Sequence, residues 1–216
     1  MGFFGKVPAR GDFVRRGLPA SFIAPWDRWL QEGIAGSRDI LGAAWLDIYL
    51  TSPVWRFALS AELAGDLAAA GVLIPSVDGV GRYFPFTLAC VLDGGPAPLQ
   101  VRSESGWFER AEALALAVLE EGGSLEQVIE GLEALGCPAP LPPAALDGEA
   151  WRFDEAATGL AHSLVRHVPP YVLFWTKGST RVPASTLLAP QLPSARQFAA
   201  LLNGAWADHG WREAAP

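Results

Sequence analysis

Residues 71–92 read GVLIPSVDGVGRYFPFTLACVL, and this stretch decides the fold class. Two near-continuous apolar runs of strand length, 71–75 and 86–92, flank a polar turn that contains two glycines. Unbroken apolar runs are typical of strands that are covered on both faces. The stretch therefore predicts two central strands of a sheet, with a polar turn between them.

Further elements are predicted on both sides of this stretch. The opening 16 residues suit an irregular hairpin or extended arm, and residues 54–59 form a third strand with Trp55 on one face. Ser21 is the expected N-cap of a helix between them. Its large apolar residues recur with a helical period: Phe22, Trp26, Trp29, Leu30 and Ile34.

Helices and strands also alternate in the second half of the chain, which favours an α/β architecture. The first expected element is a helix through Trp107 that ends at 122–123. A helix 125–135 follows, with Ser124 and Gln127 as its capping residues and Gly136 at its end. The remaining elements are a helix capped by Asp154, a strand 171–176 and a last helix with Ser194 and Gln197 as its capping residues.

Length and composition bound the class of protein. The 216 residues predict one domain, 1–216, with a proline-rich loop at 137–148 between two halves. A formal charge of −7 and a pI near 5.0 disfavour nucleic acid as a partner. No apolar run is long enough to span a bilayer and no secretory signal opens the chain, so we expect no membrane insertion and a cytoplasmic location.

Local motifs for catalysis or metal binding are missing from the sequence. His162 and His167 are five residues apart and do not share one face of a helix, so they are a poor metal pair. We therefore expect no catalytic residues, no metal and no cofactor. Cys90 and Cys137 are predicted to remain reduced and separate, because structural disulfides are rare in the cytosol. The nine tryptophans are interpreted mainly as core residues.

Charge is unevenly distributed along the chain. Residues 104–155 carry twelve acidic and two basic residues, which most simply line the solvated faces of helices. The first 16 residues instead carry four cations beside three phenylalanines, and we predict a partner surface there, because arginine and aromatic rings dominate binding hot spots. Its candidate residues are Lys6, Arg10, Asp12, Arg15 and Arg16. The alternative is that the rings are buried along a sheet edge and Arg15 and Arg16 are simply solvated.

The turn between the two central strands carries the best local constellation of polar groups. Ser76, Asp78 and Arg82 lie where loops of α/β scaffolds often carry function. Asp78 and Arg82 are four residues apart and could pair across the turn. We interpret the pair first as a structural clamp, then as a ligand or partner contact, and only last as a catalytic site.

Several longer sequence segments resemble those of one known family, the TagF (ImpM) family of type VI secretion accessory proteins. They are GFFGKVPARGDFVRRGLP (2–19), FIAPWDRWLQ (22–31), PVWRFALS (53–60), GVLIPSVDGVGRYFPFTLA (71–89) and the C-terminal stretch 174–204. The resemblance implies a three-layer α/β/α sandwich, for which we expect a mixed sheet.

The resemblance also implies a function. Members of the family are understood as cytosolic, non-enzymatic proteins that restrain secretion assembly after translation, acting with a forkhead-associated scaffold protein. The first hypothesis is therefore a negative regulator that acts through protein binding. The second is a small-ligand-binding or hydrolytic α/β domain that uses Ser76, Asp78 and Arg82, and a pocket with Asp78 or Arg82 at its floor would favour it.

Overall fold

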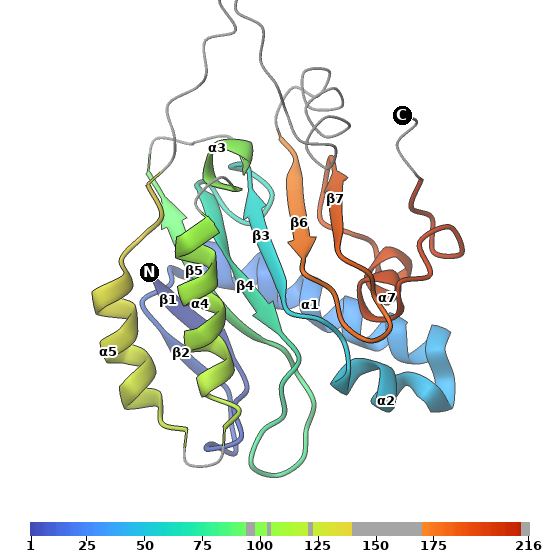
Figure 1. The fold of residues 1–216 in the computed structure, drawn as a ribbon, viewed down its shortest axis with the longest axis horizontal. Coiled ribbons are helices and arrows are strands. Elements are labelled where there is room, and N and C mark those ends of the chain that lie inside the picture. Colours follow the sequence, from blue (N-terminus) through green and yellow to red (C-terminus); the bar gives the residue numbers. More distant parts are fainter. Residues whose placement is uncertain (94–97, 103–104, 121–122, 140–169, 213–216) are drawn as a thin grey trace, which may run out of the picture.

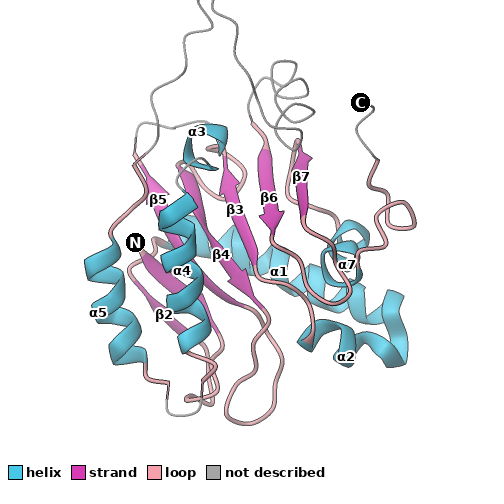
Figure 2. Cartoon of the chain, viewed as in Figure 1, coloured by secondary structure: helices cyan, strands magenta, loops and turns pink. Residues whose placement is uncertain are grey.

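The computed structural model describes residues 1–93, 98–102, 105–120, 123–139 and 170–212. A seven-stranded sheet crosses the molecule in the order β2-β1-β5-β4-β3-β6-β7 (Figure 1). Its strands are β1 (Gly2–Gly5), β2 (Val14–Arg16), β3 (Trp55–Leu59), β4 (Ala68–Ile74), β5 (Phe86–Leu92), β6 (Val172–Thr176) and β7 (Ser185–Ala189). The helices are α1 (Ala20–Leu41), α2 (Trp45–Leu50), α3 (Pro98–Arg102), α4 (Ser105–Ala117), α5 (Leu125–Leu135) and α7 (Ala195–Asn203), with a 3-10 turn at Gly42–Ala44 (Figure 2).

The expectation of a mixed sheet is wrong. Every pair among the described strands is antiparallel. For four of the six pairs the reason lies in the connections, because β1 to β2, β3 to β4, β4 to β5 and β6 to β7 are each joined by a loop without a helix. Short loops of this kind return the chain antiparallel, whereas a parallel pair needs a crossover. The coarser expectation, a fold of mixed α and β elements, is confirmed.

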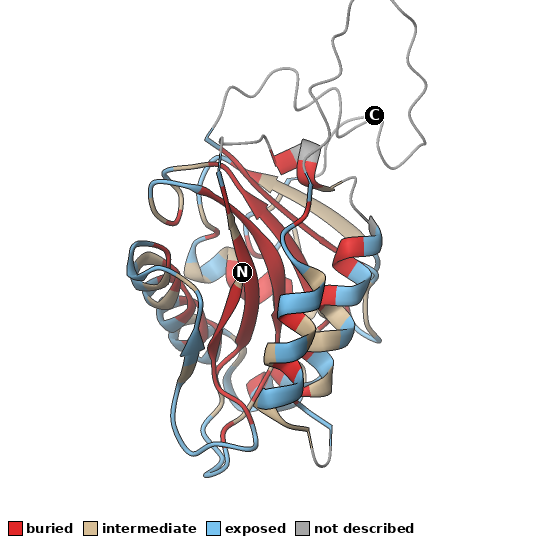
Figure 3. Cartoon of the chain, turned by 90° about the vertical axis from the view of Figure 1, so that its left-hand side faces the viewer, coloured by how far each residue is buried: buried red, intermediate tan, exposed pale blue. Residues whose placement is uncertain are grey.

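The central strands are buried on both faces, as their apolar runs predict (Figure 3). Alternate residues along each strand enter two different core clusters. In β6, for example, Phe174 belongs to the cluster with α1 and α7, and Leu173 belongs to the cluster with α4 and α5. Helices therefore supply apolar side chains to both sides of the sheet.

The tryptophans that the structure describes are mostly core residues. Six of them are buried: Trp26, Trp29, Trp45, Trp55, Trp107 and Trp175. Buried indoles need a partner for the N–H group. Trp26 Nε1 donates to Thr87 Oγ1 at 2.9 Å and Trp55 Nε1 donates to the Leu201 carbonyl at 3.0 Å. These bonds fix α1 and α7 against the strands they cover.

The predicted N-cap is present in two of the three described helices with a predicted cap, and Gly136 closes α5 as predicted, whereas α4 ends at Ala117 and not at 122–123. Ser194 and Gln197 form a complete capping box at α7, and Ser124 accepts a hydrogen bond from the Gln127 N–H at α5. Helix α1 instead begins at Ala20 after Pro19, which has no side chain that can cap. The helix predicted after Asp154 and most of the 137–148 loop lie outside the described residues. Three elements, α2, α3 and β7, were not predicted.

The two cysteines are neither separate nor reduced, so that prediction is wrong. Cys90 in β5 and Cys137 after α5 form a disulfide, with 5.7 Å between their Cα atoms. The two cysteines are 47 residues apart in the sequence, so no local pattern predicts their contact. Helix α5 packs over the face of the sheet to which Cys90 points, and its C-terminal end at Gly136 delivers Cys137 beside that strand.

Candidate interaction site

Two loops at one end of the sheet form a single unit, here called the double loop: residues 6–13 between β1 and β2, and residues 75–85 between β4 and β5. They lie side by side because β1 pairs with β5. The Gly79 N–H donates to the Arg10 carbonyl at 2.8 Å, and the Ser76 hydroxyl donates to the Lys6 carbonyl at 2.7 Å. Arg82 Nη2 donates to the Gly11 carbonyl. These hydrogen bonds join two segments that are far apart in the sequence.

Asp78 is the centre of the double loop. Its Oδ2 accepts hydrogen bonds from Lys6 Nζ at 2.9 Å and from Arg82 Nε at 2.7 Å. Its Oδ1 accepts the backbone N–H groups of Val80 at 3.1 Å and Arg82 at 2.8 Å. The Asp78 and Arg82 side chains thus pair, as the sequence suggested, but the buried cation is Lys6, whose role the sequence did not reveal.

The protonation state of Asp78 is set by two opposed effects. Burial alone would raise the pKa of this carboxyl. Hydrogen bonds from the Arg82 N–H, the Lys6 ammonium, the Arg82 guanidinium and the Val80 N–H outweigh it and hold the pKa well below its usual range. Asp78 is therefore ionised at neutral pH and fully engaged as an acceptor, which does not suit a general acid or base.

This depressed pKa predicts a pH dependence of stability. A carboxyl whose folded-state pKa lies below the unfolded value stabilises the fold in full above about pH 4, and this contribution is lost as the pH falls toward the folded-state pKa. Thermal melts of the wild type and Asp78→Asn should differ most near neutral pH and converge below about pH 4. A difference in melting temperature that stays constant down to about pH 2.5 would contradict this assignment.

The base of the double loop is held by Tyr49 from α2. The Tyr49 hydroxyl donates to the Ser76 carbonyl and accepts the Ser76 N–H, both at 2.9 Å. Burial raises the pKa of this phenol above its ordinary value, so it stays neutral. Its ring also stacks on Trp45, with 4.8 Å between the ring centroids. Helix α2 therefore supports the loop that carries Asp78.

Tyr49→Phe tests this support. The variant keeps the ring but leaves the buried Ser76 N–H without its partner, whereas the Ser76 carbonyl still accepts the Phe84 N–H. We expect the free energy of unfolding to fall by about 1–3 kcal/mol, measured by urea denaturation. Tyr83→Phe is the matched control, because Tyr83 is half-buried and packs on the same rings. Equal stability of Tyr49→Phe and the wild type would show that the hydroxyl contributes nothing.

The outer surface of the double loop combines apolar and basic groups. Val80 is 69% exposed and Phe13 is 42% exposed, the Phe13 ring packing edge-on against Phe84 at 4.9 Å. Arg10 and Arg82 are also exposed, with side-chain exposures of 58% and 56%. Exposed apolar groups beside arginines are features of binding surfaces.

The structure separates the predicted site residues into two groups. Lys6, Ser76 and Asp78 are buried and form the internal framework. Arg10, Asp12, Arg15, Arg16 and Arg82 are exposed. Arg15 and Arg16 are successive residues of β2, so their side chains point to opposite faces of the sheet and do not form one patch.

The acidic segment and the basic arm meet in space. Arg10 pairs with Glu126 at 3.9 Å and Arg16 pairs with Glu133 at 3.8 Å, both partners coming from α5. All four side chains are more than half exposed, so each pair contributes little to stability. The two charge clusters of the sequence are thus neighbours on one surface.

A second buried ion pair was missed by the sequence analysis. Arg56 in β3 donates from Nε and Nη2 to the two carboxylate oxygens of Glu112 in α4, at 2.9 and 2.6 Å. Lys177 also lies 3.9 Å from Glu112. A local pattern does not indicate a contact between residues 56 positions apart. The one indication in the sequence is that Arg56 stands in an apolar run, VWRFAL, where a charged side chain needs a buried partner.

The described residues offer little for metal binding or a membrane. In the ranges that the structure covers, His, Cys, Asp and Glu side chains form no group of three or more that could hold a metal ion. His162 and His167 lie outside these ranges, and His209 contacts Asn203 at 3.2 Å. Among the described helices, none is both long and apolar enough to cross a bilayer.

Comparison with known proteins identifies the family. The model of the TagF N-terminal domain, described as type VI secretion system-associated, matches residues 2–135. The chain therefore belongs to this family. It is also similar to a solved structure, PA0076 from Pseudomonas aeruginosa PAO1 at 2.05 Å resolution, with 38% identity and a TM-score of 0.78. That match covers 100% of this chain and 96% of the other. No curated protein matches the chain.

Proposed function

We propose that this chain is a cytoplasmic, non-enzymatic regulator that restrains type VI secretion assembly by binding the forkhead-associated scaffold protein of the same system. Membership of a type VI secretion system-associated family supports the accessory role. Restraint, the scaffold partner and the location come from the resemblance described above. The finer expectation of a three-layer α/β/α sandwich belongs to the same proposal, and the two core clusters support it.

The observation that most supports a binding role is the structure of the double loop. Its buried polar groups are hydrogen-bonded to one another, and its surface exposes apolar and basic side chains. Inside, Asp78 accepts four hydrogen bonds from Lys6, Val80 and Arg82. Outside, Val80 and Phe13 are exposed next to Arg10. An interior of this kind fixes the shape of the surface, and a preformed surface binds a partner at low conformational cost.

The hydrolytic alternative gains no support from the geometry. The Ser76 hydroxyl donates its proton to the Lys6 carbonyl, whereas a nucleophile needs a base at that position. Asp78 has no free acceptor position facing solvent, since its side chain is fully buried. Two cavities among the described residues, one beside α5 and one between α2, β4 and α7, are lined by residues other than Ser76, Asp78 and Arg82. We therefore retain the binding role alone.

Val80→Asp tests the proposed surface. Tagged wild type and variant are expressed with the secretion cluster from which the chain comes, and the forkhead-associated protein is scored in the captured material together with secretion. Val80 is 69% exposed, so its replacement should leave folding intact while an interfacial charge weakens capture at least tenfold. Loss of capture should be accompanied by released secretion.

Leu116→Asp is the matched control, because Leu116 is an exposed leucine, 41% accessible, on α4 rather than on the double loop. It should capture the scaffold protein as the wild type does. Normal capture by Val80→Asp would place the interface elsewhere. Failure of the wild type itself to capture the scaffold protein would reject the proposed partner.

A further inference from the structure

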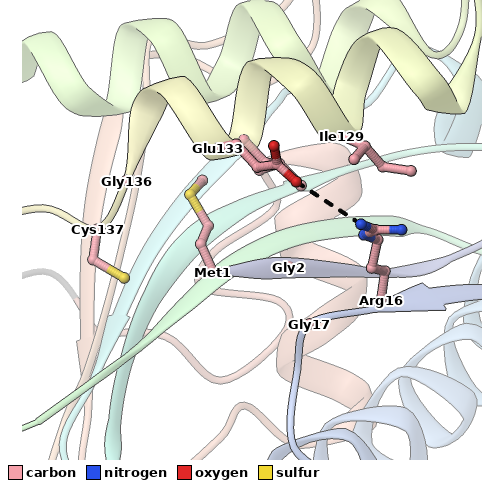
Figure 4. A pocket seen from close by; sticks show the side chains of 9 residues that line it. Met1, Gly2, Arg16, Gly17, Ile129, Glu133, Gly136 and Cys137 are labelled. Atoms are coloured by element: carbon pink, nitrogen blue, oxygen red, sulfur yellow. Dashed lines mark ion pairs between the residues drawn. The ribbon is translucent and has the colours of Figure 1, made fainter.

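A cavity of about 300 Å³ lies where α5 meets the edge of the sheet. Its walls come from the start of β1, the end of β2 and the C-terminal half of α5 with the residues that follow it (Figure 4). Ile129 supplies apolar surface, Arg16 and Glu133 supply charge, and Cys137 lies at one end. This volume lies at the lower end of the range that small-molecule sites occupy.

The cavity borders one cysteine of the disulfide and not the other. Cys137 is exposed and lines the cavity, whereas Cys90 is completely buried in β5. A thiolate exchanges with a disulfide only by reaching one of the two sulfurs directly. A small thiol in this cavity can therefore attack Cys137, while Cys90 remains protected.

The charged groups of the cavity favour an anionic ligand. Arg16 lies 3.8 Å from Glu133, and both side chains are more than half exposed. An exposed ion pair of this length is weak, so the Arg16 guanidinium can exchange Glu133 for the carboxylate of a ligand. A carboxylate held by arginine gains paired, charge-assisted hydrogen bonds.

We propose that this cavity is a thiol–disulfide exchange site, at which a small anionic peptide thiol of the glutathione type binds through Arg16 and attacks Cys137. The thiolate sulfur bonds to Cys137 Sγ, the bond between Cys137 and Cys90 breaks, and Cys90 leaves with the electron pair and takes a proton from water. A second thiol then attacks the mixed disulfide. This releases the Cys137 thiol and one oxidised dimer of the small thiol, so two thiols reduce one disulfide.

The exchange would loosen α5. The disulfide ties the end of this helix to β5 across 47 residues of sequence. Without it, the helix is held by its apolar face, which includes buried Val128 and Leu132, by the exposed ion pairs and by the bond from Trp107 Nε1 to the Gly136 carbonyl. Cytosolic disulfides in general are transient or redox-sensing. A role for this exchange in the cell depends on the proposed cytoplasmic location. The exchange reaction of the purified protein does not depend on it.

The test uses purified, oxidised full-length protein and two thiols of different charge, reduced glutathione and neutral 2-mercaptoethanol. Exchange is stopped with acid and mapped by peptide mass spectrometry. Glutathione should form a mixed disulfide on the peptide that contains Cys137. Arg16→Glu should slow the reaction with glutathione roughly tenfold and leave the reaction with mercaptoethanol within about twofold. Ile129→Trp, which fills the cavity, should slow both.

Arg15→Glu is the matched control, since it changes the neighbouring charge on the opposite face of β2. It should react as the wild type does, and thermal melts should confirm that all variants are folded. Adducts on Cys90, equal slowing by Arg15→Glu and Arg16→Glu, or no exchange in the native protein would each overturn the proposal. Two free thiols in protein that was never reduced would do the same.

Discussion

Asp78→Ala is expected to lower the melting temperature by roughly 10 °C, because breaking a buried ion pair leaves an uncompensated charge. The stranded charge is the Lys6 ammonium, whose side chain is 7% exposed. Its other neighbour is the ring of Phe13 at 5.0 Å, which cannot replace a carboxylate. Differential scanning calorimetry at neutral pH measures the effect directly.

Arg82→Ala and Asp12→Ala are the controls for this prediction. Arg82 also bonds Asp78, but its side chain is 56% exposed and solvent can replace it, so we expect a loss of a few degrees at most. Asp12 is exposed and accepts only the neighbouring Phe13 N–H among the described bonds, so its loss should also cost a few degrees at most. A loss for Arg82→Ala as large as that for Asp78→Ala would contradict the view that Lys6 is the buried partner.

Glu112→Ala is expected to reduce the free energy of unfolding by about 3–5 kcal/mol, because it leaves the guanidinium of Arg56 buried without a partner. Arg56 is only 5% exposed. The reverse variant, Arg56→Ala, should cost less, since the Glu112 carboxylate is 14% exposed and Lys177 remains 3.9 Å away. Urea denaturation followed by circular dichroism compares the two.

The double variant Arg56→Met/Glu112→Leu separates pairing from packing. Buried ion pairs can often be replaced by apolar side chains of similar volume at little cost. The double variant should therefore be more stable than Glu112→Ala. A double variant that is less stable than both single variants would mean that the pair itself, rather than the stranded charge, determines stability.

Local patterns predicted most of the elements of the fold. The apolar run 86–92 is strand β5 with the predicted bounds, and Ser124 and Gly136 flank α5 as the capping rules require. Helix α2 was missed because a six-residue segment is too short to show helical periodicity. The direction of the strands was missed because apolar runs are equally compatible with parallel and antiparallel neighbours.

Contacts between residues far apart in the sequence were harder to predict than contacts within one turn. Asp78 and Arg82 are four residues apart, and their pairing could be suggested from the turn that contains them. Lys6 is 72 residues from Asp78 and reaches it only because β1 pairs with β5. The same holds for Cys90 and Cys137, which helix packing brings together. Such contacts follow from topology, and no local pattern encodes them.

Calorimetric titration of the purified chain with the forkhead-associated scaffold protein proposed as its partner measures the proposed binding directly. We expect saturable binding with an affinity of roughly micromolar or better, weakened at least tenfold by Val80→Asp and unchanged by Leu116→Asp. Absence of binding between the two folded proteins would reject the proposed partner, and equal binding by Val80→Asp and the wild type would reject the double loop as the binding surface.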